Sequence, residues 1–164
     1  HLSQLADMYS EKIIESQIKY DVIFGPAYKG IPLAAAVATV LSQKLSKPIS
    51  ICFDRKEEKD HGEGGVLIGS VKNKMVLIID DVLSSGTALK YSIPLIQEAG
   101  GTVSAAIIAL DRQEQDEGLQ VSEKLANELN IPIYSISNLD NLISFLETSG
   151  QKEIAKKLRS SSKN

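Results

Sequence analysis

Apolar positions along the chain recur at two different spacings, and their alternation predicts the order of helices and strands. Leu2, Leu5, Tyr9 and Ile13 recur at helical spacing, which predicts an amphipathic helix over about 3–18. Short runs of consecutive apolar residues instead predict buried strands at 22–24, 49–53, 75–79, 103–110 and 133–136, with a shorter candidate at 66–68. Further helices are expected at 30–45, 87–99, 118–129 and 139–146.

Strands that alternate with helices and are apolar on both faces are typical of a parallel sheet covered by helices on each side. We therefore predict an α/β fold with a central, mostly parallel sheet flanked by helices. A single domain is expected over 1–159, followed by a disordered tail over 160–164. Because such sheets bind ligands outside the carboxyl ends of their strands, the segments that follow strands are the candidates for a binding or catalytic site.

Charge and cysteine content narrow the class of protein. The formal net charge is -3, with 18 Lys+Arg against 21 Asp+Glu, which argues against broad electrostatic binding to nucleic acid or anionic membranes. Cys52 is the single cysteine, so the sequence has no disulfide framework and no cysteine zinc site. No apolar run approaches the roughly 20 residues of a membrane span. A cytoplasmic protein without nucleic-acid or membrane partners is expected.

The segment 76–89 contains the strongest candidate for a binding site. Its apolar strand leads directly to two carboxylates, Asp80 and Asp81. The turn that follows contributes Ser84, Ser85, Gly86 and Thr87. Backbone N–H groups in such a turn and at a helix N-terminus bind anions, while paired carboxylates suit ribose hydroxyls or the water shell of Mg²⁺. An ordinary capped helix is the alternative, but the combination of acids and small residues favours a binding site.

A second candidate follows the strand at 22–24. The string Gly25-Pro26-Ala27-Tyr28-Lys29-Gly30 combines a glycine turn with a lysine at the start of a helix. Backbone donors and one cation in this arrangement suit a pyrophosphate group. A plain strand–turn–helix with a solvated lysine explains the same residues equally well.

A third candidate is the segment 54–65, which is almost wholly charged or glycine and has no periodicity. Most runs of mixed charge are solvated surface loops. Its cationic residues are spaced so that a closing loop would bring several donors to one pyrophosphate: Arg55, Lys56, Lys59 and His61. The glycines at 62, 64 and 65 would serve as a hinge.

The segment 76–89 resembles the signature that binds 5-phosphoribosyl 1-pyrophosphate (PRPP) in type I phosphoribosyltransferases. This resemblance implies the fold of that family, with a long mobile catalytic loop. It also implies that Asp80 and Asp81 contact the ribose hydroxyls, and that the turn 84–87 holds the 5-phosphate. Mg²⁺ would be bound through PRPP and water, with Asp80 and Asp81 as possible ligands.

The segments 24–34 and 53–65 resemble the pyrophosphate loop and the mobile loop of orotate phosphoribosyltransferases. The resemblance implies transfer of ribose 5-phosphate from PRPP to orotate, which gives orotidine 5'-monophosphate and pyrophosphate in pyrimidine (UMP) biosynthesis. It assigns PRPP binding to Lys29, Arg55, Lys56, Lys59 and His61, and catalysis to Lys59, His61 and Asp81. It further implies a homodimer in which the 54–65 loop reaches the neighbouring active site.

Arg112 follows the predicted strand 103–110 and Asp111. On charge alone it is a surface residue, but by resemblance it stands where the family binds the orotate carboxylate, which suits a bidentate arginine. Tyr28, Lys29 and Ser84 complete the orotate site that the resemblance implies. The family normally carries a base-covering segment before this point, and no Lys-Ser-Gly-Arg-like stretch occurs here. Part of the base pocket is therefore expected to be missing.

Three alternatives share the PRPP signature. One is a phosphoribosyltransferase for a purine or uracil, against which Tyr28-Lys29 and the 55–61 string argue. Another is a regulator that binds PRPP or a nucleotide, often with a nucleic-acid surface, which the acidic balance of this chain does not favour. The last is a fragment of the orotate enzyme that binds PRPP without turnover.

Replacement of Lys59 by alanine tests the role of the charged loop. We expect turnover to fall far more than the free energy of unfolding, because an exposed loop residue contacts little of the core. Steady-state kinetics together with thermal melting of Lys59→Ala measure the two effects. Unchanged turnover would rule out a catalytic role for this lysine.

Overall fold

Short strands and longer helices alternate along the chain, as its apolar pattern predicts. The computed structural model describes residues 1–55 and 66–161. The strands are β1 (Val22–Gly25), β2 (Ser50–Asp54), β3 (Leu67–Ile68), β4 (Met75–Leu83), β5 (Thr102–Asp111), β6 (Gln115–Asp116), β7 (Leu119–Gln120) and β8 (Ile133–Asn138). The helices are α1 (Leu2–Ser16), α2 (Gly30–Leu45), α3 (Thr87–Glu98), α4 (Val121–Leu129), α5 (Leu139–Thr148) and α6 (Lys152–Ser161).

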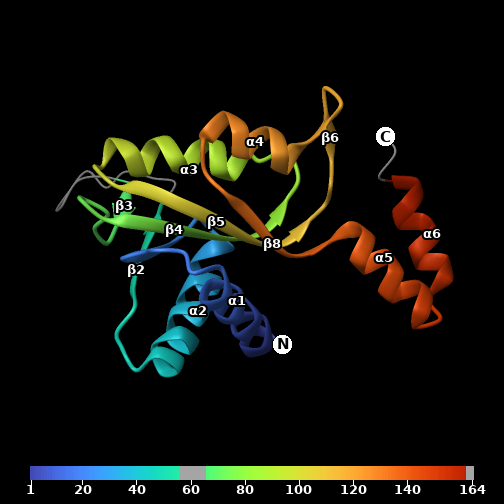
Figure 1. Cartoon of the computed structure of the whole chain (residues 1–164), viewed down its shortest axis with the longest axis horizontal. Helices are drawn as coiled ribbons and strands as arrows, with labels where there is room; N and C mark the ends of the chain where they lie inside the picture. Colours follow the sequence, from blue (N-terminus) through green and yellow to red (C-terminus); the bar gives the residue numbers. More distant parts are fainter. Residues whose placement is uncertain (56–65, 162–164) are drawn as a thin grey trace.

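The main sheet has six strands in the order β3-β2-β1-β4-β5-β8. Within the described residues its neighbouring strands are parallel, except for the antiparallel pair of β2 and β3. Helices α1 and α2 cover one face of the sheet, and α3 and α4 cover the other (Figure 1). The predicted α/β class, with a mostly parallel sheet flanked by helices, is confirmed.

The central strand β4 is buried on both faces, which explains its unbroken run of apolar residues. Val76 and Ile78 pack toward the α3 and α4 side, where they join one apolar cluster. Leu77 and Ile79 pack toward α1 and α2 in a second cluster. All four side chains are inaccessible to solvent. The two clusters hold the sheet rigidly between its helices and so fix the position of its carboxyl edge.

Strand β4 extends beyond its predicted end. The apolar run predicted a strand that stops at Ile79 and a turn from Asp80 onward, but pairing with β5 continues to Leu83, opposite Asp111. Hydrogen bonds of the ladder therefore override the polar character of Asp80 and Asp81. The two carboxylates are carried by the last part of a strand rather than by a loose turn.

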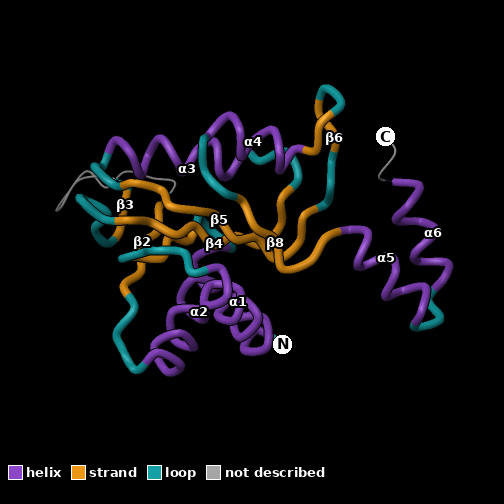
Figure 2. The backbone as a smooth tube through the Cα atoms, viewed as in Figure 1, coloured by secondary structure: helices purple, strands orange, loops and turns teal. Residues whose placement is uncertain are grey.

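A small hairpin replaces the first turn of the helix predicted at 118–129. Strands β6 and β7 pair antiparallel, and the two residues between them, Glu117 and Gly118, both have positive φ, which fits a tight hairpin turn. Helix α4 starts only at Val121, whose N–H donates to the carbonyl of Glu114. The hairpin rises beside α4 (Figure 2). Strands of two residues carry no periodic signal, so the sequence did not reveal them.

The C-terminal helices α5 and α6 form a separate pair beyond β8 (Figure 1). Ile143 and Leu146 of α5 pack against Ala155 of α6. Helix α6 was not predicted, and it reaches Ser161, so residues 160–161 of the predicted disordered tail are helical. Residues 162–164 lie outside the described part of the chain. None of the described helices is both long and apolar enough to cross a membrane.

Candidate active site

Three segments that are distant in sequence meet at the carboxyl edge of the sheet. They are the 25–30 loop after β1, the end of β4 with the turn 84–87, and Arg112 after β5. The ammonium nitrogen of Lys29 lies 3.2 Å from a carboxylate oxygen of Asp81, which joins the first two. The N–H of Arg112 donates to the carbonyl of Leu83 at 3.0 Å, which joins the second and third. The sequence-predicted segments therefore form one site, where the parallel-sheet rule expects it.

The two carboxylates at the end of β4 have different surroundings. Asp80 is only 8% exposed, and one of its carboxylate oxygens accepts the N–H of Asp81 at 2.9 Å. Burial raises the pKa of Asp80 to about 6; the neighbouring charges of Asp81 and Asp54 add to the rise, while Lys29 and the Asp81 N–H oppose it. Asp81 is more exposed, and one of its carboxylate oxygens accepts a hydrogen bond from the N–H of Val82. The buried member of the pair is thus poised to change charge near neutral pH.

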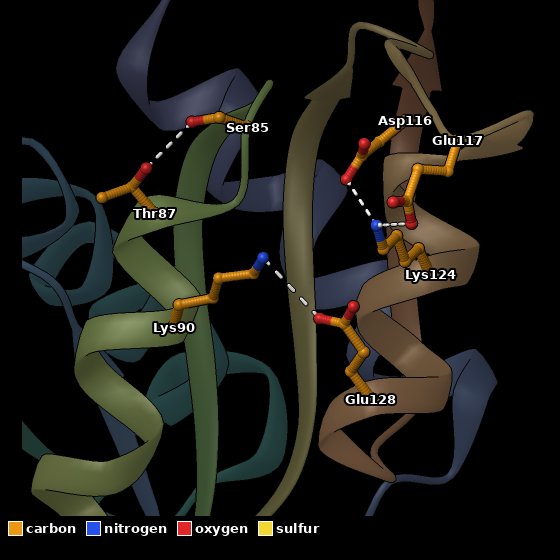
Figure 3. Close-up of polar contacts among 7 residues, drawn as sticks. All are labelled: Ser85, Thr87, Lys90, Asp116, Glu117, Lys124 and Glu128. Atoms are coloured by element: carbon orange, nitrogen blue, oxygen red, sulfur yellow. Dashed lines mark hydrogen bonds and ion pairs between the residues drawn. The ribbon is translucent and has the colours of Figure 1, made fainter.

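The turn 84–87 leads from β4 into α3 and forms a small cavity. Gly86 precedes the helix with φ 73°, and a Cβ there would lie 2.1 Å from Leu125 Cδ1, so this position requires glycine. The hydroxyls of Ser85 and Thr87 are 2.9 Å apart (Figure 3). Together with Ser84 and the buried Asp80, these residues line a cavity of about 110 Å³ at the start of α3. Hydroxyl groups at a helix N-terminus form a site for an anion of phosphate size.

The 25–30 loop is compact because its two glycines face each other. A Cβ on Gly25 would lie 2.3 Å from the carbonyl oxygen of Gly30, and the N–H of Gly30 donates to the carbonyl of Pro26 at 2.9 Å. The Ala27 N–H donates to a carboxylate oxygen of Asp54 at 2.7 Å. The peptide bond between Ala27 and Tyr28 is cis. The loop is therefore held in one shape by backbone packing and one buried carboxylate.

Asp54 was not among the predicted site residues. Its side chain is 3% exposed at the end of β2 and anchors the neighbouring loop after β1. The prediction from the sequence placed Asp54 at the start of the charged segment 54–65 and assigned it no role. An aspartate at the carboxyl end of a parallel strand is the signal that points to it, because adjacent strand ends share one edge.

Lys29 projects into solvent above the acids. Its side chain is 79% exposed, so its ion pair with Asp81 contributes little to stability. An exposed, weakly paired cation beside a loop of backbone donors is free to exchange its partner for an incoming anion. Tyr28, the preceding residue, is largely exposed as well.

Arg112 stands on a well-fixed connection after β5. Its guanidinium is half exposed and lies 3.2 Å from a carboxylate oxygen of Glu114. The next residue, Gln113, is held by its side chain, which accepts the N–H of Asp140 and donates to the carboxylate of that residue. A bound carboxylate would therefore meet an arginine whose backbone is rigid and whose present partner is another carboxylate.

Ion pairs on the α3 and α4 side hold the surroundings of the turn together. Lys124 of α4 contacts Asp116 and Glu117 of the hairpin, each at 2.7 Å (Figure 3). Hydrogen bonds to these two acids raise the pKa of Lys124 above its ordinary value. Lys90 of α3 pairs with Glu128 of α4 at 3.6 Å. The pairs of Lys124 fix the hairpin beside α4. None of these ion pairs includes a hydroxyl group of the turn 84–87.

Part of the predicted site lies outside the described residues. Lys56, Lys59 and His61 belong to 56–65, as do the hinge glycines. The base of this loop is described: the Arg55 N–H donates to the carbonyl of Val66 at 2.9 Å, beside β2 and β3. The charged segment therefore starts after β2 and returns to β3, next to Asp54.

The oxygen-rich end of β4 suits a hard cation such as Mg²⁺. Asp80 and Asp81 offer carboxylate oxygens, the ligand type that Mg²⁺ prefers. Among the described residues, no group of three or more His, Cys, Asp or Glu side chains is arranged to hold a metal ion. A Mg²⁺ ion at this place would need oxygen ligands from other molecules, such as a phosphate group and water.

Comparison with known proteins gives one consistent result. The model of the phosphoribosyl transferase domain family matches residues 2–130. An orotate phosphoribosyltransferase of Acinetobacter baumannii (strain ACICU) is 46% identical over 154 residues, which cover 93% of this chain and 71% of that protein.

Solved structures agree with this result. The crystal structure of orotate phosphoribosyltransferase from Francisella tularensis superposes with a TM-score of 0.79 at 35% identity, covering 98% of this chain and 76% of that one. An orotate phosphoribosyltransferase of Mycobacterium tuberculosis H37Rv, solved in complex with 5-phospho-α-D-ribosyl 1-diphosphate, shares the fold with a TM-score of 0.68 at 20% identity. That match covers 86% of this chain and 75% of the other.

Replacement of Asp80 by asparagine tests the buried carboxylate. The pKa of Asp80 is about 6 in the folded state against an ordinary 3.8, so its stabilising contribution is fully present below pH 3.8 and is lost as pH rises through 6. At pH 7.5 we expect Asp80→Asn to raise the free energy of unfolding by about 1–3 kcal/mol, because the charged form no longer has to be buried.

Urea unfolding at pH 4 and pH 7.5 measures this difference, with Asp81→Asn as the control for a more exposed carboxylate. The gain should shrink at pH 4, where Asp80 is already neutral in the folded protein. An equal change in the free energy of unfolding at pH 4 and pH 7.5 would mean that burying the charged form of Asp80 does not destabilise the protein.

Proposed function

Because the chain belongs to the orotate phosphoribosyltransferase family of phosphoribosyl transferase domains, we propose that it transfers ribose 5-phosphate from PRPP to orotate. The products are orotidine 5'-monophosphate and pyrophosphate, so the reaction is a pentosyl transfer of pyrimidine biosynthesis. The observation that carries the proposal is the 3.2 Å contact between Lys29 and Asp81. It joins the loop suited to pyrophosphate with the acids suited to ribose, at the same edge as the phosphate turn.

The three parts of PRPP have three matching subsites. The 5-phosphate takes the turn of Ser84, Ser85, Gly86 and Thr87 at the start of α3, where hydroxyls and helix N–H groups converge. The ribose hydroxyls donate to Asp80 and Asp81. The pyrophosphate lies against the 25–30 loop and accepts from Lys29, which exchanges its exposed pair with Asp81 for the phosphate oxygens.

Charge at the pyrophosphate is the main catalytic requirement. Mg²⁺, when bound, supplies positive charge to the pyrophosphate oxygens, and carboxylate oxygens of Asp80 and Asp81 fit its ligand preference. Lys29 and the loop cations Arg55, Lys56, Lys59 and His61 add donors to the same group. These donors stabilise the negative charge that develops as the leaving group departs.

The bond changes take place at ribose C1. The bond from C1 to the pyrophosphate oxygen breaks, and a bond from C1 to the orotate ring nitrogen forms. The orotate ring nitrogen attacks as its anion, after its proton has passed to solvent, so the site needs no strong base beside the nitrogen. Lys59 or His61 would donate a proton to the departing pyrophosphate, and Asp81 would hold the ribose hydroxyls as positive charge builds on the ring.

Orotate recognition rests on Arg112. Its guanidinium takes the orotate carboxylate in place of Glu114, from which it is now 3.2 Å away. Tyr28, Lys29 and Ser84 would complete the contacts to the base. The working unit would be a cytoplasmic homodimer in which the 54–65 loop of one subunit reaches the active site of the other.

Pyrophosphate release tests the proposal directly. The protein is incubated with PRPP and Mg²⁺, with orotate, uracil, hypoxanthine and adenine in parallel reactions. Release with orotate alone is the expected result. Release with a purine or uracil would contradict the substrate, and no release with any base would favour a PRPP-binding protein without catalysis.

Replacement of Arg112 by lysine tests base recognition within the same assay. Lysine keeps the charge but loses the planar fork, so we expect the KM for orotate to rise about tenfold or more. The KM for PRPP should stay within about a factor of two, because the substitution keeps the backbone contact of Arg112 with Leu83 and the guanidinium has no proposed contact with PRPP. An unchanged KM for orotate would remove Arg112 from the site.

A further inference from the structure

The two strands that flank β4 stop pairing with it at different residues along its length. Strand β1 ends at Gly25, and its last pair with β4 is Phe24 with Ile78. On the other side, β5 stays paired with β4 as far as Leu83. The last part of β4, which carries the two acids, therefore has a ladder partner on one side only. On the side of β1 this part of β4 has no ladder partner, while Asp80 stays paired in register with Ile108 of β5.

Tyr9 of helix α1 adds a hydrogen-bond donor to this part of β4. Its hydroxyl donates to the backbone carbonyl of Asp80 at 2.5 Å, across 71 residues of sequence. The side chain is completely buried in the cluster that contains Leu77, Ile79 and Ile107. Burial, followed by the negative charges of Asp80 and Asp81, raises the pKa of the hydroxyl far above its ordinary value. Tyr9 thus stays protonated and remains a donor over the whole working range of pH.

Both ends of the peptide unit between Asp80 and Asp81 are held. Its carbonyl accepts the Tyr9 hydroxyl, and its N–H donates to the carboxylate of Asp80 at 2.9 Å. The orientation of this peptide plane decides where the Asp80 carboxylate lies and in which direction the Asp81 side chain leaves the strand. Without the hydroxyl, the plane would be held only by the ladder with β5 and by the contact of the Asp81 N–H with the Asp80 carboxylate.

We propose that Tyr9 is a positioning residue that holds the Asp80–Asp81 peptide in the orientation needed to bind the ribose of PRPP. The proposal rests on the proposed function, in which these two acids receive the ribose hydroxyls. Tyr9 acts through the backbone and does not itself reach the substrate. It couples the N-terminal helix to the substrate site through one hydrogen bond.

Tyr20 offers a matched control in the same chain. Its hydroxyl is also buried, but among the described residues it has no hydrogen-bond partner. It precedes Asp21, whose N–H donates to the carbonyl of Met75 at the opposite, amino-terminal end of β4. Tyr20→Phe therefore removes a buried hydroxyl of the same kind without touching the acid pair.

The first measurement compares the Kd for PRPP with Mg²⁺ in the wild-type protein, Tyr9→Phe and Tyr20→Phe by calorimetry, with the melting temperature of each. We expect Tyr9→Phe to bind PRPP about fivefold more weakly or worse, because the Asp80 carbonyl loses the Tyr9 hydroxyl and the acids lose part of the support for their orientation. Tyr20→Phe should bind within about a factor of two of the wild type. Equal Kd values for all three proteins would overturn the proposal.

The second measurement needs no ligand. The Asp80 carboxyl, which faces Asp81, Lys29 and Asp54, is titrated by carbon NMR in the free proteins. Loosening of the peptide should let this carboxyl gain solvent, so its pKa should fall in Tyr9→Phe and stay unchanged in Tyr20→Phe. A weaker Kd with an unchanged titration would also overturn the proposal, because the loss would then come from general loosening of the fold.

The two measurements separate the proposal from the function on which it rests. If the wild-type protein does not bind PRPP, the proposed function fails. The titration alone then decides whether Tyr9 holds the acid pair. If the wild type binds PRPP and neither readout changes in Tyr9→Phe, only the positioning role fails.

Discussion

The pairing of β4 with β5 over the whole length of β4 is the constraint on which the site depends. This ladder runs from Met75 to Leu83 and carries Asp80 and Asp81 past the end of β1. The loop after β1 can then fold back over the strand end, where Lys29 meets Asp81. The connection that carries Arg112 begins at the end of β5, where Asp111 is paired with Leu83. The loops are positioned by strand lengths, which the buried core holds fixed.

The acid pair at the end of β4 has an unfavourable charge arrangement. Asp80 is buried next to Asp81, with Asp54 nearby, and the N–H of Asp81 and the exposed Lys29 are the groups that offset these acids in their effect on its pKa. A buried carboxylate without close compensation destabilises the folded protein at neutral pH. In the proposed function, ribose hydroxyls and a hard cation would reverse this effect, so that binding would offset the instability of the free site.

The sequence predicted most of the fold because the fold is governed by long apolar patterns. Helix α2 has the predicted bounds of 30–45, and every predicted strand is present, although several ends shift by a few residues. The misses share a physical cause. Pairing with β5 extended β4 through two charged residues, and the two-residue strands of the hairpin are too short to leave a period. The prediction also overlooked helix α6, which packs on α5 through only a few apolar side chains.

The candidate site was predicted at the level of segments but not of supporting contacts. The acids, the turn and Lys29 were predicted from their residue types, and the structure brings Lys29 and Asp81 together. Asp54 and Tyr9 were not, because each acts on backbone groups that lie far away in sequence. Their contacts depend on where neighbouring strands end relative to one another, and the apolar pattern of the sequence does not show this.

The central claim is that the buried carboxylate at the end of β4 receives the ribose of PRPP. Carbon NMR of the Asp80 carboxyl, followed over pH with and without PRPP and Mg²⁺, tests it most directly. We predict a pKa of about 6 for Asp80 in the free protein and a clear fall when PRPP binds, because hydroxyl donors and a cation favour the charged form. A pKa that stays the same in the presence of saturating PRPP would mean that this carboxylate does not receive the ribose.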